Sequence, residues 1–248
     1  MELLAAVGGL SFVLASFVVG LRLLGLARRT RALPELVIGL GLVLMGGFGY
    51  PLVAIARLAT AWSDATRTGI FLLSMACSWI GIVAVCVFNQ RVFRPRSRAA
   101  QALVIAVGLG QILALVLQAR HPGLRAAALS NDGLGLRIFT AGHGVPLAWA
   151  AFESFRYGAQ LTRRARLGLA DPVVVDRLRL WGISMLAALV INVASTTAAC
   201  FGVDLAVTVL GALIIAPLGL VAAGCTWLAF VPPAAYLRRV AARFAPGS

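Results

Sequence analysis

The most chemically informative residues of this chain are a glutamate and a histidine within one largely apolar segment. Glu153 and His143 lie in the segment 139–157. Ionisable groups are costly inside a bilayer, so each is a functional candidate by default. Helical spacing places both on one stripe with Ala150 and Tyr157, about 15 Å apart along the axis at 1.5 Å per residue. They are candidate stations on a path for a proton or a small solute. In the alternative interpretation, Glu153 pairs with a cytoplasmic arginine and His143 is a structural residue at the membrane interface.

Small polar residues form two further stripes at helical spacing. These stripes are Ser184, Ala188, Asn192, Ser195 and Thr196 in one apolar segment, and Ser74, Ser78, Gly81 and Asn89 in another. In membranes such stripes usually mean close packing and hydrogen bonds between helices. We expect these stripes to serve packing, and Asn192 is the member best placed for the alternative role, contact with a ligand. Asn89, near a helix end, is expected either to gate a path or to cap a neighbouring loop.

A cluster of glycines followed by proline predicts a bent helix in the segment 34–56. The glycines are Gly39, Gly41, Gly46, Gly47 and Gly49, and Tyr50 and Pro51 follow them. Proline disrupts the preceding helical turn, and bent membrane helices often line cavities, because their freed carbonyls need partners other than lipid. Tyr50 then faces either the cavity or the membrane interface. The candidate cavity or proton path therefore comprises Glu153, His143, Tyr50, Asn89, Asn192 and Ser78.

The composition indicates which elements must position these residues. The 248-residue chain is 61% hydrophobic and 12% charged, whereas soluble domains are about 45–50% apolar and about 25% charged. A membrane helix needs about 20 apolar residues to cross a hydrocarbon core of roughly 30 Å. Seven segments meet this measure: 3–26, 34–56, 69–92, 100–117, 139–157, 180–200 and 205–231. We therefore predict an all-α, polytopic membrane protein, with residues 1–248 forming a single seven-helix domain.

The net charge of +14 comes from 22 arginines and no lysine. Alternate loops and span ends divide the arginines into seventeen on one side and five on the other, the five being Arg57, Arg67, Arg120, Arg125 and Arg137. Because arginine is enriched in cytoplasmic loops, the C-terminus is predicted in the cytoplasm and the N-terminus outside. Charges beside membrane spans act as topology determinants near anionic headgroups. The expected partner is the lipid bilayer, and nucleic acid is not expected.

Missing residue types exclude several kinds of chemistry. Without lysine the chain cannot form a retinal Schiff base. Two histidines, four cysteines without metal-ligand spacing and no phosphate-binding glycine loop argue against haem, a metal centre or a nucleotide site. We therefore expect no cofactor, no metal and no enzymatic activity.

The predicted cytoplasmic loop after residue 157 offers a surface of mixed charge. Its members are Arg163, Arg164, Asp171 and Asp176. Asp171 precedes a proline and suits a helix N-cap, and Asp176 lies three residues before Arg179, close enough to pair on a helix. The surface could dock a partner, or it is a solvated cap that also sets topology.

The chain contains an approximate internal repeat. Arg28-Arg29-Thr30-Arg31 precedes Pro34, as Arg163-Arg164-Ala165-Arg166 precedes Pro172, and the segment 80–95 aligns with 218–233 without a gap. These matches predict a first three-helix unit at 1–98, a linker helix at 99–120 and a second unit at 138–240. Because one span separates the units, both have the same orientation, which makes a 3+1+3 parallel repeat.

This architecture resembles that of the PQ-loop and SWEET-like membrane proteins, although no proline-glutamine pair is present. The stretches RRTRALPELVIGLGLVLMGGFGYPL and RRARLGLADPVVVDRLRLWG resemble a family of bacterial seven-span proteins without an assigned biochemical function. The resemblance covers about a fifth of the chain and implies a bacterial inner-membrane protein, but it brings no catalytic residues.

We predict from these features a small-solute transporter with a polar-lined cavity between the two repeats, coupled to protons through Glu153. The alternative is a non-retinal seven-helix sensor or receptor that signals through its cytoplasmic loops to a separate partner. A homo-oligomer is compatible with either function.

Overall fold

The structure of the protein, a computed structural model, describes residues 2–120, 134–205 and 208–243. Within these ranges the regular structure is helical: α1 (Glu2–Thr30), α2 (Leu33–Gly41), the π-helix η1 (Leu42–Gly49), α3 (Tyr50–Leu58), α4 (Asp64–Phe93), α5 (Arg98–Ala119), α7 (Leu134–Ala165), α8 (Pro172–Cys200), α9 (Val209–Phe230) and α10 (Ala234–Ala242). His121 and Arg125 lie outside the described residues.

Six helices in the described part of the chain are long and apolar enough to cross a membrane. They are Val7–Thr30, Leu33–Leu58, Asp64–Phe93, Arg98–Ala119, Pro172–Cys200 and Val209–Phe230. This agrees with the prediction of an all-α, multi-pass membrane protein. The fifth predicted span corresponds to α7, which has 32 residues but is less apolar, because Arg137, His143, Glu153 and Arg156 interrupt it. The seventh crossing therefore stays a prediction.

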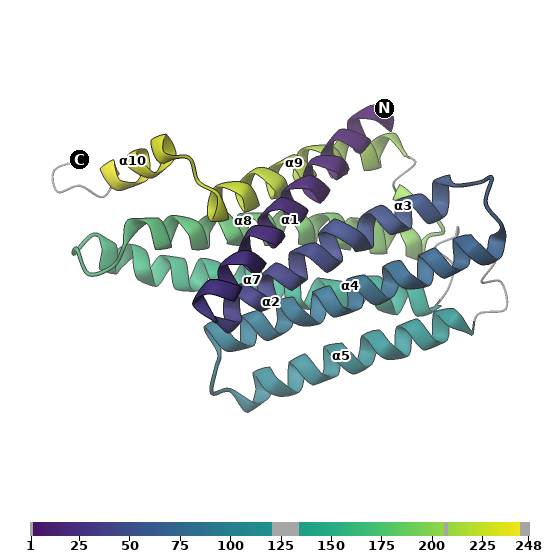
Figure 1. Ribbon diagram of the computed structural model, residues 1–248, viewed down its shortest axis with the longest axis horizontal. Coiled ribbons are helices and arrows are strands. Elements are labelled where there is room, and N and C mark those ends of the chain that lie inside the picture. The colour runs from purple at the N-terminus through teal and green to yellow at the C-terminus, as the bar shows by residue number, and fades with distance from the viewer. Residues whose placement is uncertain (1, 121–133, 206–207, 244–248) are drawn as a thin grey trace.

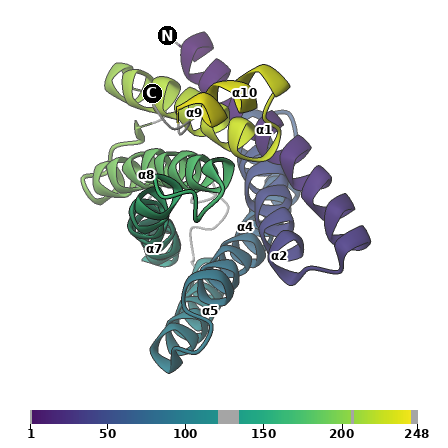
Figure 2. The same ribbon diagram turned by 90° about the vertical axis from the view of Figure 1, so that its left-hand side faces the viewer.

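The helices form a ring in the order of the chain (Figure 2). Each long helix packs on the next, and α9 returns to pack on α1, while α5 lies against α4 and α7. Figure 2 shows α5 projecting from this ring. The two predicted repeats form two arcs, with α1 to α4 in the first and α7 to α9 in the second, and they meet where α9 contacts α1 and where α4 contacts α7.

Helix irregularities do not recur between the two arcs. The π-helix and Pro51 belong to the middle helix of the first arc, whereas Pro146 and Pro217 lie inside α7 and α9 of the second arc. The 3+1+3 repeat thus stays a prediction from the sequence.

Most arginines gather at one end of the bundle. Figure 1 shows there, on its left, the connections from α1 to α2, from α4 to α5 and from α7 to α8, together with α10. We call this end, with Arg28, Arg94, Arg163 and Arg239 among its residues, the arginine-rich end. The opposite end carries Arg57, Arg67, Arg120 and Arg137.

Helix starts follow the predicted capping chemistry. Pro34 and Pro172 occupy the first turns of α2 and α8, and Asp171 caps α8 by accepting a hydrogen bond from the Val173 N–H at 2.8 Å. The last span was predicted from residue 205, with its ends defined to within about two to four residues, and the helix starts four residues later. α9 begins at Val209, because the Thr208 hydroxyl accepts the Gly211 N–H and fixes the N-cap there.

The glycine-rich segment is irregular, as predicted, and takes the form of the π-helix η1. Its glycines let neighbouring helices approach closely: a Cβ at Gly46 would overlap the side chain of Ser16 in α1, and a Cβ at Gly49 would overlap that of Ser78 in α4. Such π-helical turns are rare and occur frequently at functional sites. The segment leads directly into α3, which begins at Tyr50.

Two apolar clusters fill parts of the interior. The larger one, which we call the Trp181 core, contains Val19, Leu23, Ile38, Leu42, Val85, Leu147, Ala150, Ala151, Trp181 and Met185, and Phe88 and Phe230 pack against it. The smaller one, the Phe71 core, contains Ala56, Phe71, Met75, Ala114, Leu136 and Phe139.

Candidate functional site

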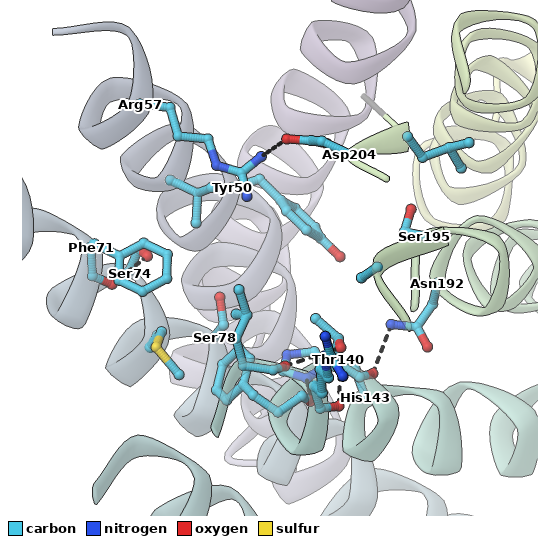
Figure 3. A pocket seen from close by; sticks show the side chains of 17 residues that line it. Tyr50, Arg57, Phe71, Ser74, Ser78, Thr140, His143, Asn192, Ser195 and Asp204 are labelled. Carbon is cyan, nitrogen blue, oxygen red and sulfur yellow. Dashed lines mark hydrogen bonds and ion pairs between the residues drawn. The ribbon is translucent and has the colours of Figure 1, made fainter. Parts of the chain in front are cut away.

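A cavity of about 220 Å³ lies inside the bundle beside the Phe71 core. Side chains from α3, α4, α7 and α8, and from the segment before α9, surround it (Figure 3). Its polar lining residues are Tyr50, Arg57, Ser74, Ser78, Arg137, Thr140, His143, Asn192, Ser195 and Asp204. Because these helix portions lie away from the arginine-rich end, we call the opposite end of the bundle the cavity end.

Four of the six predicted cavity residues line this space, namely Tyr50, Ser78, His143 and Asn192. Tyr50 is also half exposed and makes an edge contact with Phe12, so it has features of both positions that the sequence left open. The other two predicted residues, Asn89 and Glu153, lie toward the arginine-rich end.

Helix α5 positions the α7 side of the cavity through two buried glutamines. Gln111 donates from Nε2 to the Phe139 carbonyl at 3.0 Å, and Gln118 accepts the Leu136 N–H at 3.1 Å. The residue facing Gln111 on α7 is Gly142, where a Cβ would overlap the glutamine side chain. Sequence reasoning missed this contact, although two glutamines seven residues apart in an apolar helix were the available signal.

His143 is held in a defined orientation at the cavity wall. Its Nδ1 lies 2.7 Å from the Phe139 carbonyl oxygen, which can only accept a hydrogen bond. Nδ1 therefore carries the hydrogen, and in the neutral ring Nε2 is an acceptor. Asn192 donates from Nδ2 to the Thr140 carbonyl at 2.9 Å and so ties α8 to α7 beside the histidine.

An ion pair stands at the edge of the cavity nearest the bundle end. Arg57 Nη1 of α3 lies 3.1 Å from Asp204 Oδ2 in the segment before α9, and their side chains are 26% and 31% exposed. Arg67 donates to the carbonyls of Ala56 and Arg57 and holds the end of α3 in place. From the sequence, Arg57 was one of the arginines that set the membrane topology, and Asp204 was not a candidate. The two partners are 147 residues apart, so no local pattern joins them.

A second ion pair lies at the arginine-rich end. Arg94 Nε lies 2.6 Å from Glu153 Oε1, and the side chains are 40% and 6% exposed. Glu153 is thus paired with an arginine, as the alternative interpretation of the sequence has it. Leu147 and Ala150 of the Trp181 core lie between its level and that of His143 along α7. The stripe from His143 to Glu153 is therefore packed over this stretch.

Asn89 ties two helices together at the level of the Trp181 core. Its Nδ2 donates to the Pro146 carbonyl of α7 at 3.1 Å, and the residue is fully buried. This contact joins α4 of the first arc to α7 of the second.

The four predicted loop residues lie at or near helix ends of the arginine-rich end. Arg163 and Arg164 are in the last turn of α7, and Asp171 caps α8. The predicted pairing of Asp176 with Arg179 is absent from the described residues. Asp176 instead accepts a hydrogen bond from the Tyr236 hydroxyl of α10 at 2.7 Å. Burial and this hydrogen bond raise the pKa of Tyr236 to about 12, so the phenol stays protonated at neutral pH.

Comparisons with known proteins return no match for this chain among family models, curated proteins or solved structures. Among the described residues, no group of three or more His, Cys, Asp or Glu side chains could hold a metal ion. The four cysteines are free thiols.

Proposed function

We propose that the protein is a small-solute transporter that works by alternating access, with the cavity as its solute site. The observation that carries this proposal is the asymmetric interior. A polar cavity occupies the half near the cavity end, whereas the Trp181 core and the ion pair of Arg94 with Glu153 fill the half near the arginine-rich end. A solute in the cavity can reach the arginine-rich side only after this second half opens.

Both ion pairs join the first arc to the second, so each pair can hold one end of the bundle closed. Arg57 of α3 bonds to Asp204 beyond α8, and Arg94 after α4 bonds to Glu153 of α7. The pair of Arg57 with Asp204 is partly exposed on both sides, and such pairs contribute only about 0–1 kcal/mol, so thermal motion can break it. In the other pair only Arg94 is exposed, so Glu153 has to gain contact with water when that end opens. The π-helix η1 and Pro146 in α7 supply one irregular helix in each arc where the arcs could bend.

In this proposal α7 is the seventh crossing and the arginine-rich end faces the cytoplasm of a bacterium, as the arginine distribution favours. The cavity then faces outward in the conformation described here. Glu153 acts as a closing carboxylate of the cytoplasmic half rather than as a lining group of the solute site.

Cysteine accessibility tests this proposal without knowledge of the solute. Cys77, Cys86, Cys200 and Cys225 are replaced by alanine, and Ser195→Cys introduces one thiol in the cavity lining. Right-side-out and inside-out vesicles are treated with a membrane-impermeant thiol reagent. We expect labelling mainly from the outer face, and Glu153→Gln in the same background raises labelling from the cytoplasmic face several-fold.

A matched control separates opening of the bundle from loss of a negative charge. Glu35→Gln removes a carboxylate at the same end, but Glu35 accepts its hydrogen bond from Thr30 within the first arc. We expect this variant to label like the parent protein. Labelling from the outer face alone in every variant would contradict alternating access and favour the sensor or receptor.

A further inference from the structure

Among the described residues, the charged groups that line the cavity do not balance. Arg57 and Arg137 contribute two positive charges, and Asp204 contributes one negative charge. Asp204 lies at 3.1 Å from Arg57. The described part of the chain contains no carboxylate in an ion pair with Arg137.

Arg137 also has an unused donor inside the protein. Its Nε is shielded from solvent and has no hydrogen-bond acceptor among the described residues. A guanidinium keeps its charge at any physiological pH and carries five N–H donors, so it cannot relieve this situation by losing a proton. A buried donor without an acceptor is destabilising, and an anion in the cavity beside this guanidinium would offset its positive charge.

We propose that the cavity binds a small organic anion whose acidic group is held by Arg137. This inference rests on the proposed transport function only where it calls the bound anion a transported solute. Arginine recognises carboxylates by two parallel hydrogen bonds, which gives both strength and orientation. The Tyr50 and Ser78 hydroxyls offer further donors on the opposite wall of the same cavity.

The rest of the lining selects an organic rather than an inorganic anion. Phe71, Met75, Leu136 and Phe139 bring the Phe71 core to the cavity surface. These side chains suit an apolar body and offer nothing to the oxygens of a sulfate or a phosphate. Typical ligand pockets have about 300–1,000 Å³, so the observed 220 Å³ indicates a compact molecule.

Ligands of one shape and three charges test this class of solute. The protein is placed in phosphatidylcholine nanodiscs, so that anionic lipids do not compete for the site. Hexanoate and benzoate are compared with their amides and with hexylamine and benzylamine, by thermal shift and by equilibrium dialysis. We expect at least one carboxylate to raise the unfolding temperature, because binding to the native state stabilises it. Its amide should bind at least tenfold more weakly, and its amine should not bind.

Variants assign the effect to Arg137. Arg137→Gln should weaken carboxylate binding at least tenfold, and Arg137→Lys should keep part of it, because it keeps the charge but loses the planar fork. Arg120→Gln is the matched control, since Arg120 is exposed at the same end of the bundle and does not line the cavity. It should bind like the parent protein.

Several outcomes would overturn the anion proposal: no binding of either carboxylate, equal binding of a carboxylate and its amide, or unchanged binding in a folded Arg137→Gln protein. If that variant does not fold, the comparison of the three ligand charges on the parent protein still decides. Nanodiscs have no separate compartments, so this experiment is independent of transport. Carboxylate binding without cytoplasmic labelling of the cavity cysteine would retain the anion site and remove the transporter.

Discussion

The two ends of this helix bundle use the same chemical device in different surroundings. Each end has an arginine–carboxylate pair that joins the two arcs of the ring. At the cavity end, the pair of Arg57 with Asp204 borders open space lined by hydroxyls, an imidazole and an amide. At the arginine-rich end, Arg94 of the other pair directly follows Phe93, whose ring contacts those of Phe88 and Tyr157.

The difference gives one ring of helices a hollow half and a packed half. Trp181 contacts Phe88 and Phe230 edge to face, with ring centroids 6.1 and 5.6 Å apart, and this packing leaves little room for solute. Around the cavity, Ser74, Ser78 and Ser195 are among the lining residues, and these smaller side chains leave open space. If the comparison is right, substitutions of one kind should have different effects in the two halves.

The largest expected effect concerns the buried carboxylate at the arginine-rich end. Arg94→Gln leaves Glu153 without its cationic partner, and we expect a loss of about 3 kcal/mol in the free energy of unfolding. Glu153→Gln should cost only about 1 kcal/mol, because Arg94 is 40% exposed and can turn toward water. Reversible unfolding in mixed micelles measures both values. Equal losses for the two variants would mean that burial does not distinguish the partners.

The next largest effect should come from enlarging one small side chain in each half of the bundle. Ala150 is fully buried in the Trp181 core, so Ala150→Leu should cost about 2 kcal/mol through overpacking. Ser195→Leu points the same added volume at the cavity, so stability should stay within about 0.5 kcal/mol while carboxylate binding is lost. The same unfolding assay and the dialysis experiment check the pair. A strongly destabilised Ser195→Leu protein would show that the cavity cannot accept a side chain.

Two serines of α8 provide a smaller and closely matched comparison. The Ser184 hydroxyl donates to the Ala222 carbonyl at 3.0 Å and lies 2.8 Å from the Thr226 hydroxyl, so it links α8 to α9. Ser184→Ala should cost about 0.6 kcal/mol, the average for hydrogen bonds between membrane helices. Ser195→Ala, on the same helix at the cavity, should leave the unfolding free energy unchanged within error. A larger loss at Ser195 than at Ser184 would reverse the proposed contrast between the halves.

The sequence predicted the helices better than their interior contacts, for physical reasons. Span length and prolines beside Glu35 and Asp171 are local properties, and the helices lie where these signals put them. The lining of the cavity could be predicted from the sequence only in part. His143 in α7 and Asn192 in α8 were each predicted from the residue spacing along their own helix. The ion pair of Arg57 with Asp204, in contrast, depends on how the helices close into a ring.

Glu153 illustrates the limit of reasoning from cost alone. A carboxylate in an apolar helix predicts a function or a partner, and the sequence could not decide between them. The deciding contact comes from Arg94, which follows the end of α4 and is 59 residues away in the chain. The short helix α10 also went unpredicted, because its nine residues are too few and too polar to meet the measure for a membrane span.

The smallest expected effect concerns helix α10. Among the described residues, the cavity end has no comparable short helix. Tyr236→Phe removes the hydrogen bond to Asp176, a side-chain link between α10 and α8. We expect a change below about 0.5 kcal/mol in global stability but several-fold faster trypsin cleavage after Arg238 and Arg239, because local opening of α10 becomes easier.

The pKa of Tyr236, raised to about 12, means that this link is fully present below the ordinary tyrosine pKa and is lost as pH rises through about 12. Cleavage of the parent protein, corrected for the activity of trypsin on an unstructured peptide, should therefore not change between pH 7 and pH 9. A cleavage rate that is equal in the Tyr236→Phe and parent proteins would show that α10 is held by its apolar contacts, such as buried Val240, rather than by the phenol.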